Sequence, residues 1–168
     1  MKLSELKGKS VVSVVEAVKL GVVGDAFVDH ALGAISALRI DASGRSDQYL
    51  VSMDQVRAIG PDVVTVSGQH ALMSPSQMGD DGSRVALTSL VGCRVVAEDG
   101  RVLGTVAEVD FDPGSGRLDS LEYGGDGLQA LLGTRHHLDP RNVIGVGPRV
   151  LTVRDVASRP HEPHEKVA

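Results

Sequence analysis

Four acidic residues near a predicted turn form the group in the sequence whose chemistry best suits a cation. These residues are Glu108, Asp110, Asp112 and Asp119. Asp-x-Asp also begins an EF-hand loop, in which carboxylates bind Ca²⁺. The pattern then fails, because Ser115 stands where that loop needs its Gly and Leu121 stands where it needs a Glu. We therefore predict a strand end followed by a turn, and cation binding by the acidic group stays open as the alternative.

The histidines do not form a metal-binding motif. His136 and His137 are adjacent, so on a strand their side chains point to opposite faces of the sheet. His161 and His164 could share a metal only on a helix, and Pro163 between them opposes a helix. We predict no metal and no cofactor.

Nucleophilic catalysis has no recognisable motif either. Cys93 is the single cysteine and lies beside Arg94, which could lower the pKa of its thiol. Its apolar strand context favours a place in the core. The sequence has no nucleophile elbow with a Ser-His-Asp order, no Walker loop, and no Gly-x-Gly-x-x-Gly that opens a helix. We therefore predict that the protein is not an enzyme.

Charge and hydropathy narrow the class of partner. The chain carries 17 basic and 22 acidic residues, a formal net charge of −5, without a basic run. Nucleic-acid binding is disfavoured, because a protein that neutralises phosphates needs a basic face. Residues 1–10 do not read as a secretory signal, and no apolar stretch approaches the ~18 residues of a membrane span. We expect a cytoplasmic protein.

The elements that would position any site are short strands. Aromatic residues make up only 2% of the 168 residues, and the many valines suit a pleated sheet better than a helix. The 20 glycines predict frequent tight turns. In the second half, turns at 98–100 and 112–116 separate apolar strand segments. These predicted strands are 93–97, 102–111, 118–123, 135–138, 143–146 and 150–153.

An internal repeat organises these strands into two units. Four blocks recur in the same order: 6–12 match 90–96, 18–23 match 101–106, 33–38 match 116–121, and 56–66 match 143–153. Short strands at regular spacing predict a small barrel or sandwich. We predict an all-β protein whose segments are a first unit over 1–67, a linker over 68–88, a second unit over 89–157, and a disordered tail over 158–168.

These repeated blocks resemble the PRC-barrel family. Each unit begins with Leu-x-Gly-x-x-Val, at Leu6 and at Leu90, and continues with Leu-Gly-x-Val. The segment 54–66 resembles the family's closing pattern, Asp-x-Val-x-x-Ile-Gly-x-Asp-x-Val. The resemblance implies two tandem small six-stranded β-barrels. It also suggests roles seen elsewhere in the family, in ribosome-maturation factors and in a photosynthetic reaction-centre subunit, but this chain lacks the membrane helix of that subunit.

The sequence favours an adaptor or scaffold that binds a protein partner. A short apolar stretch and the strand after it are the candidate partner-binding residues: Leu128, Leu131, Leu132, Arg135 and His136. A homo-oligomer stays open. The alternative function is an RNA- or ribosome-associated factor, for which the second unit would gather its arginines on one face. These are Arg94, Arg101, Arg117, Arg135, Arg141 and Arg149.

Overall fold

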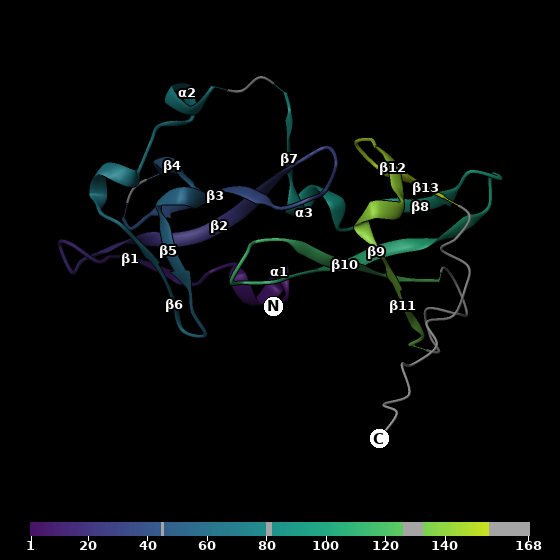
Figure 1. The fold of residues 1–168 in the computed structure, drawn as a ribbon, viewed down its shortest axis with the longest axis horizontal. Helices are drawn as coiled ribbons and strands as arrows, with labels where there is room; N and C mark the ends of the chain where they lie inside the picture. The colour runs from purple at the N-terminus through teal and green to yellow at the C-terminus, as the bar shows by residue number, and fades with distance from the viewer. Residues whose placement is uncertain (45, 80–81, 126–132, 155–168) are drawn as a thin grey trace.

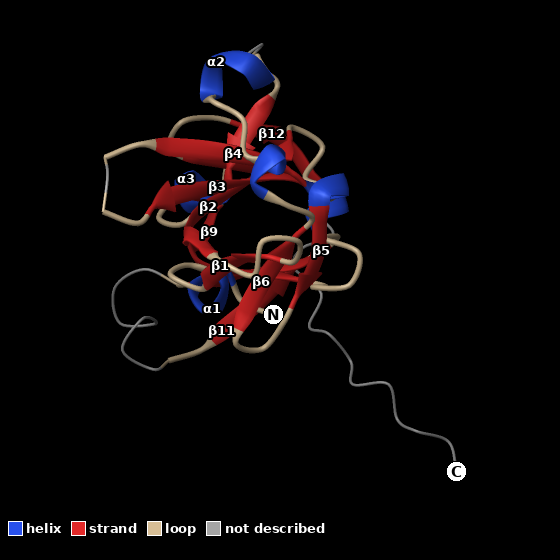
Figure 2. Cartoon of the chain, turned by 90° about the vertical axis from the view of Figure 1, so that its left-hand side faces the viewer, coloured by secondary structure: helices blue, strands red, loops and turns tan. Residues whose placement is uncertain are grey.

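The computed structural model describes residues 1–44, 46–79, 82–125 and 133–154 as two β-rich units that follow one another along the chain (Figure 1). Figure 2 views the chain along the long axis of Figure 1, so that the strands of the two units overlap. No helix within these described ranges combines the length and the apolar character needed to cross a membrane.

The first unit is a sheet of short, Val-rich strands. Its strands are β1 (Ser10–Ser13), β2 (Lys19–Asp29), β3 (Ile35–Ala42), β4 (Gln48–Ser52), β5 (Val56–Ile59) and β6 (Val63–Val66). They lie in the order β4-β3-β2-β1-β6-β5, and β1 runs parallel to β6. More and less buried residues alternate along β1 and β6, as expected for β-branched strands with one face on a core.

The second unit repeats this arrangement strand for strand. Its strands are β8 (Arg94–Ala97), β9 (Val102–Phe111), β10 (Leu118–Gly124), β11 (Arg135–Leu138), β12 (Val143–Val146) and β13 (Val150–Val153). They lie in the order β11-β10-β9-β8-β13-β12, and β8 runs parallel to β13. The prediction of an all-β chain with two tandem six-stranded units is therefore confirmed.

Short helical turns occupy matching places in the two units. α1 (Leu3–Leu6) and α3 (Leu87–Leu90) precede the first strand of each repeat, and both are fixed by buried leucines. The 3₁₀ turns η1 (Met53–Gln55) and η3 (Pro140–Asn142) connect the fourth strand of each unit to the fifth. α1 and α3 explain why the first repeated block begins ahead of the strand, at Leu6 and Leu90.

Both turns predicted in the second unit are present. Gly100 has a φ of +87° in the turn between β8 and β9, a conformation that Gly adopts without a steric penalty. The Asp112 carboxylate accepts hydrogen bonds from Gly114 N at 3.1 Å and from Ser115 Oγ at 2.6 Å. Asp112 therefore closes its own turn, and the pKa of its carboxyl is lowered chiefly by the Ser115 hydroxyl.

The predicted linker, 68–88, carries regular structure of its own. It contains η2 (Gln69–Ala71), α2 (Pro75–Met78) and β7 (Arg84–Ala86), and it includes the start of α3. β7 pairs with β2 and so adds a strand to the sheet of the first unit. The predicted tail, 158–168, lies outside the described residues.

One hydrophobic core runs through both units. It includes fully buried residues from each repeat, such as Leu6 and Leu38 from the first and Leu90 and Phe111 from the second. Backbone hydrogen bonds also cross between the units near Gly116, which accepts from Ile35 N at 2.8 Å. The two units therefore form one packed body.

Candidate protein-binding site

The outer edge of β11 meets no further strand within the part of the chain that the structure describes. β11 pairs with β10 in antiparallel register, with His137 opposite Glu122 and Arg135 opposite Gly124. Arg135, His136 and His137 are all exposed. An edge of this kind presents N–H and C=O groups to which an extended segment can be added.

The corresponding edge of the first unit is covered by the chain itself. Leu50 of β4 exchanges two backbone hydrogen bonds with Met73, at 2.9 and 2.8 Å. Leu50 lies opposite Arg39 of β3. His137 lies opposite Glu122 of β10, the residue that the repeat aligns with Arg39. His137 is therefore the counterpart of Leu50. The outer edge of β11 corresponds to the edge of β4 that Met73 covers in the first unit.

The adjacent histidines of β11 serve two different faces of the sheet, as the sequence predicts. The His136 ring stacks on the buried Tyr123, with 5.3 Å between ring centroids and 28° between planes. The His137 ring lies on the other face, where its Nδ1 is 3.3 Å from Ser120 Oγ. This stack holds β11 against the buried Tyr123 of β10, while the outer edge of β11 stays exposed.

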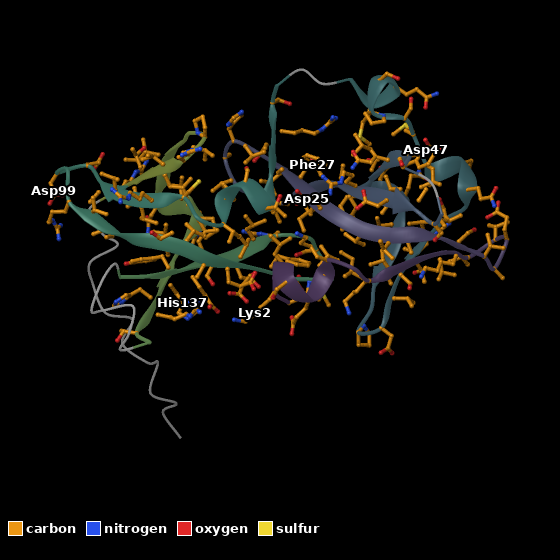
Figure 3. All side chains as sticks on the ribbon, turned by 180° about the vertical axis from the view of Figure 1, so that it is seen from behind. Lys2, Asp25, Phe27, Asp47, Asp99 and His137 are labelled. Carbon is orange, nitrogen blue, oxygen red and sulfur yellow. The ribbon has the colours of Figure 1, made fainter. Side chains whose placement is uncertain are left out.

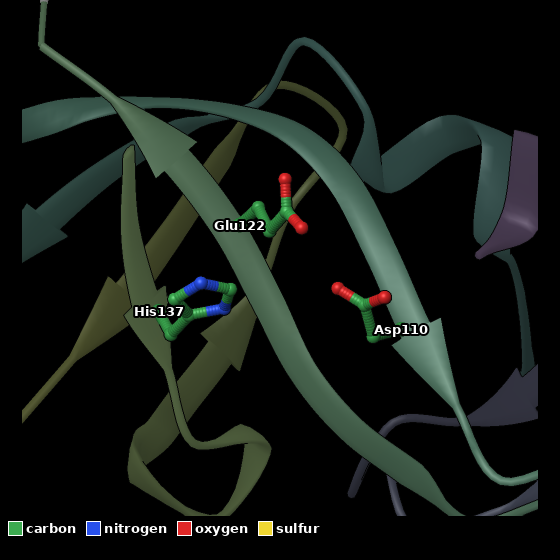
Figure 4. A group of neighbouring side chains, drawn as sticks. All are labelled: Asp110, Glu122 and His137. Atoms are coloured by element: carbon green, nitrogen blue, oxygen red, sulfur yellow. The ribbon is translucent and has the colours of Figure 1, made fainter. Parts of the chain in front are cut away.

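A charged cluster lies on the His137 face of the second sheet. Asp110 from β9, Glu122 from β10 and His137 from β11 place one nitrogen or oxygen atom each within 4.8 Å of one another (Figure 4). Lys2 reaches this cluster from the first unit, with 2.5 Å between its Nζ and Glu122 Oε1. Figure 3 shows Lys2 and His137 on the same side of the molecule. Arg135 Nη1 lies 3.9 Å from the other Glu122 oxygen.

The two carboxylates of the cluster have opposite electrostatic environments. The hydrogen bond from Lys2 holds the pKa of Glu122 below its ordinary range. Burial raises the pKa of Asp110, and the negative charge of Glu122 adds to this effect. The Glu122 carboxylate also raises the pKa of Lys2. At neutral pH the cluster therefore contains an ion pair that ties the first unit to the second.

This geometry suits a structural ion pair better than catalysis. The Lys2 ammonium already supplies a positive charge to Glu122, whose side chain is 10% exposed. Ser120 Oγ lies 3.5 Å from Asp110 Oδ2 as well as 3.3 Å from the His137 ring. A catalytic triad instead needs the acid on the far nitrogen of the histidine. The order of contacts here, Asp-Ser-His, does not match it.

Comparison with protein families agrees with this architecture. The model of the PRC-barrel domain matches the chain in two segments, residues 1–72 and 83–159. The chain belongs to the PRC-barrel family. Each matched segment contains one six-stranded unit, so the resemblance found in the sequence is confirmed. A comparison with curated proteins finds no match.

The PRC-barrel fold disperses the acidic group that the sequence singled out. Glu108 accepts a hydrogen bond from Ser4 N of the first unit at 3.3 Å, and Asp112 closes its own turn. Asp119 is exposed on β10. Of the four acidic residues, Asp110 is the one that joins Glu122 and His137.

Only some of the predicted partner-binding residues lie within the part of the chain that the structure describes. Leu128, Leu131 and Leu132 lie outside the described residues. Arg135 and His136 lie on β11, which pairs with no strand other than β10 among the described residues. Their role in binding stays a prediction.

Four residues in or beside the cluster were not predicted as site residues from the sequence: Lys2, Ser120, Glu122 and His137. Ser120 and Glu122 alternate with Leu121 along a predicted strand, so they share one face, and this signal could have identified them. Lys2 has no such signal, because only the packing of one barrel on the other brings it to β10.

The remaining candidates have structural roles. The Cys93 thiol is buried and donates to Ser89 O at 3.1 Å, and burial raises its pKa. It therefore belongs to the core and is not an activated thiol. Arg101 and Arg141 pair with Asp99 and Asp139, at 2.5 and 2.7 Å. These ion pairs offset two of the six positive charges on which the RNA alternative depends.

We expect opposite results from neutralising the two carboxylates. Glu122→Gln should lower the melting temperature at pH 7 by about 2–4 °C, because it removes the negative charge that pairs with the Lys2 ammonium. Asp110→Asn should raise it, because a half-buried carboxyl beside another carboxylate is more stable neutral. Thermal denaturation of both variants and the parent protein would measure this difference.

The pH dependence follows from the directions of the two pKa shifts. The lowered pKa of Glu122 gives a stabilising contribution that is present above the ordinary glutamate pKa and lost as the pH falls through the folded value. The contribution of Asp110 has the opposite pH dependence, because its pKa is raised on folding. Its stabilising contribution is present at low pH and is lost as the pH rises through the pKa of the folded state. The deficit of Glu122→Gln should therefore shrink towards roughly pH 3, and a constant deficit would contradict the ion pair.

Proposed function

We propose that this PRC-barrel protein is a non-enzymatic adaptor of the cytoplasm that binds a protein partner along the outer edge of β11. The observation that carries the proposal is the difference between the two equivalent edges. β4 is covered through the backbone pair of Leu50 and Met73, whereas β11 pairs with β10 alone among the described residues. An extended segment of a partner would add a strand to β11, a common mode of peptide recognition.

The side chains of β11 support a partner segment of acidic character. Arg135 and His137 are two residues apart and therefore lie on one face, while His136 lies on the other. The Arg135 side chain is 55% exposed. Arg135 makes only a long contact with Glu122, at 3.9 Å, because Lys2 binds that carboxylate at 2.5 Å. Arg135 can therefore also pair with a carboxylate from a partner. Backbone pairing would supply affinity, and these side chains would supply selectivity.

A matched pair of variants at Arg135 tests this mode of binding. If β11 repeats the geometry of β4, the N–H of Arg135 points outward like that of His137, so proline there removes a donor to the partner and none to β10. Capture of partners from native lysate by Arg135→Pro should fall about tenfold relative to the parent, equivalent to about 1.4 kcal/mol. Arg135→Ala keeps the N–H and should lose only the charge contribution.

The controls separate the adaptor from its alternative. Unchanged circular dichroism and melting temperature would show that Arg135→Pro is folded. Equal capture by the proline and alanine variants would exclude backbone pairing at β11. Capture is repeated from a lysate treated with RNase to test the RNA alternative. If ribosomal proteins are captured from the untreated lysate and lost from the treated one, the result favours a ribosome-associated factor over the adaptor.

A further inference from the structure

The contacts between the two barrels are reciprocal. Ile35 N donates to Gly116 O at 2.8 Å, and Leu118 N donates to Gly33 O at 3.0 Å. The repeat aligns Ile35 with Leu118 and Gly33 with Gly116. Each bond is therefore the counterpart of the other, as at an isologous interface between two subunits of a dimer.

The segment before the first strand of each unit is exchanged in the same reciprocal way. Met1 exchanges backbone hydrogen bonds with Phe111 of β9, at 2.8 and 2.9 Å, and α1 packs on β9. In the other direction β7 pairs with β2, and α3 packs on β2. Figure 1 shows α1 beneath the second sheet and β7 descending to the first. Each barrel is thus completed by the leading segment of the other.

Side-chain contacts of the exchanged helices follow the same correspondence. Ser4 N of α1 donates to Glu108 of β9 at 3.3 Å. Thr88 N of α3 donates to Asp25 of β2 at 3.2 Å. The repeat aligns Ser4 with Thr88 and Asp25 with Glu108.

Charges at this interface distinguish the first unit from the second. In the second sheet Glu108 lies opposite Glu122, a like-charged cross-strand pair that Lys2 offsets from the first unit. At the equivalent place in the first sheet, Asp25 lies opposite Arg39, and their pair has no net charge.

Pairing two identical units would lose this complementarity. The repeat aligns Lys2 with Ala86. Two second units would therefore bring Ala86 to Glu122 and leave the like-charged pair without a lysine. Two first units would bring Lys2 to Arg39, a like charge that already occupies Asp41 at 3.2 Å, in place of the carboxylate of Glu122. The charge pattern favours a first unit with a second unit, which is specificity by repulsion as well as attraction.

We infer that this interface is a heterotypic docking surface that a second copy of the chain can occupy: the first unit of one copy binds the second unit of the other. In an intact chain the linker holds the two units at an effective concentration of roughly millimolar, so internal pairing dominates in dilute solution. Opening of the internal interface frees both surfaces at once. Two opened copies then exchange units and form a reciprocal dimer.

Cleavage of the full-length protein between the units tests this inference directly. A protease site introduced between Gly79 and Gly82 lies ahead of β7, so each half keeps its leading segment. Unlabelled and ¹⁵N-labelled protein are cleaved, mixed and followed by native mass spectrometry. We expect the halves to stay paired and to mix until light and heavy halves are distributed statistically. Separation of the halves, or pairing of two identical halves, would overturn the inference.

Charge exchange at Lys2 tests the source of specificity. In the cleaved protein Lys2→Glu should weaken pairing of the halves by about tenfold or more, since it creates a like-charged contact. The double variant Lys2→Glu with Glu122→Lys should recover most of the pairing. Lys19→Glu makes the same charge change at the far end of β2 and should have no effect. Recovery in the double variant would show that the single variant loses pairing through the charge contact and not through misfolding. If the double variant does not recover pairing, the contact between Lys2 and Glu122 is not the source of specificity.

Discussion

Gly104→Ala is expected to destabilise the protein by about 4 kcal/mol and to lower its melting temperature by about 8–16 °C. Gly104 lies in β9, where it has a φ of +150°. A Cβ at this position would lie 2.0 Å from Gly124 O and 2.7 Å from Gly124 C. Both contacts are with the backbone of the neighbouring strand, so the added methyl group must displace β10 from β9.

The matched control separates the steric contact from the backbone conformation. Gly100 also has a positive φ, +87°, but a Cβ there would meet no atom within 4 Å. Gly100→Ala should therefore cost only about 1 kcal/mol. Thermal and urea denaturation of the two variants would give the difference, and equal destabilisation would show that strand approach at Gly104 is not the cause.

The first unit has a glycine at the equivalent position, and this shared requirement is one reason why the repeat can be recognised in the sequence. The repeat aligns Gly21 with Gly104, and a Cβ on Gly21 would lie 2.3 Å from Asp41 O. Both barrels need a residue without a side chain where the long second strand crosses the third. The spacing of leucines, valines and glycines along the chain therefore indicates the strands and turns of the fold. The positions of the strands in the second unit, its two turns and the fold class could be predicted from this spacing.

The charged cluster could be predicted only in part. Strand alternation puts Ser120 and Glu122 on one face, but the pairing register that brings His137 opposite Glu122 depends on the loop between β10 and β11. Lys2 depends on the packing of the barrels, because it reaches Glu122 from 120 residues away in sequence. A single sequence contains no local signal for such a contact.

A related reason explains why the sequence could not predict that β11 lacks a further partner strand among the described residues. The repeat makes the two units look alike, so it predicts like edges, whereas the segment after β6 covers β4 through Met73. The residues that align with 69–73 in the second unit are 156–160, which share little of their sequence and lie outside the described residues. The difference between the described edges of the two units thus comes from the segment that follows β6 and not from the repeated strands.

Asp25→Ala is the second substitution with a large expected effect, about 3 kcal/mol. Asp25 is 2% exposed and lies at the interface between the units, as Figure 3 shows. Its carboxylate accepts hydrogen bonds from Ala26 N at 2.8 Å, from Thr88 N at 3.2 Å, and from the Thr88 hydroxyl. Alanine would leave these donors without an acceptor in a site from which water is largely excluded.

The equivalent residue of the other barrel provides the control for Asp25. Glu108→Ala removes an acceptor for Ser4 N, but Glu108 is only half-buried and Ser4 is exposed, so its cost should be about 0.5 kcal/mol. Asp25→Asn keeps one carbonyl oxygen and should fall between the two alanine variants. Because Asp25 and Thr88 act as a unit, adding Thr88→Val to Asp25→Ala should cost less than the sum of the single changes. Additive effects, or equal costs for Asp25→Ala and Glu108→Ala, would show that the α3 contact does not hold the two barrels together.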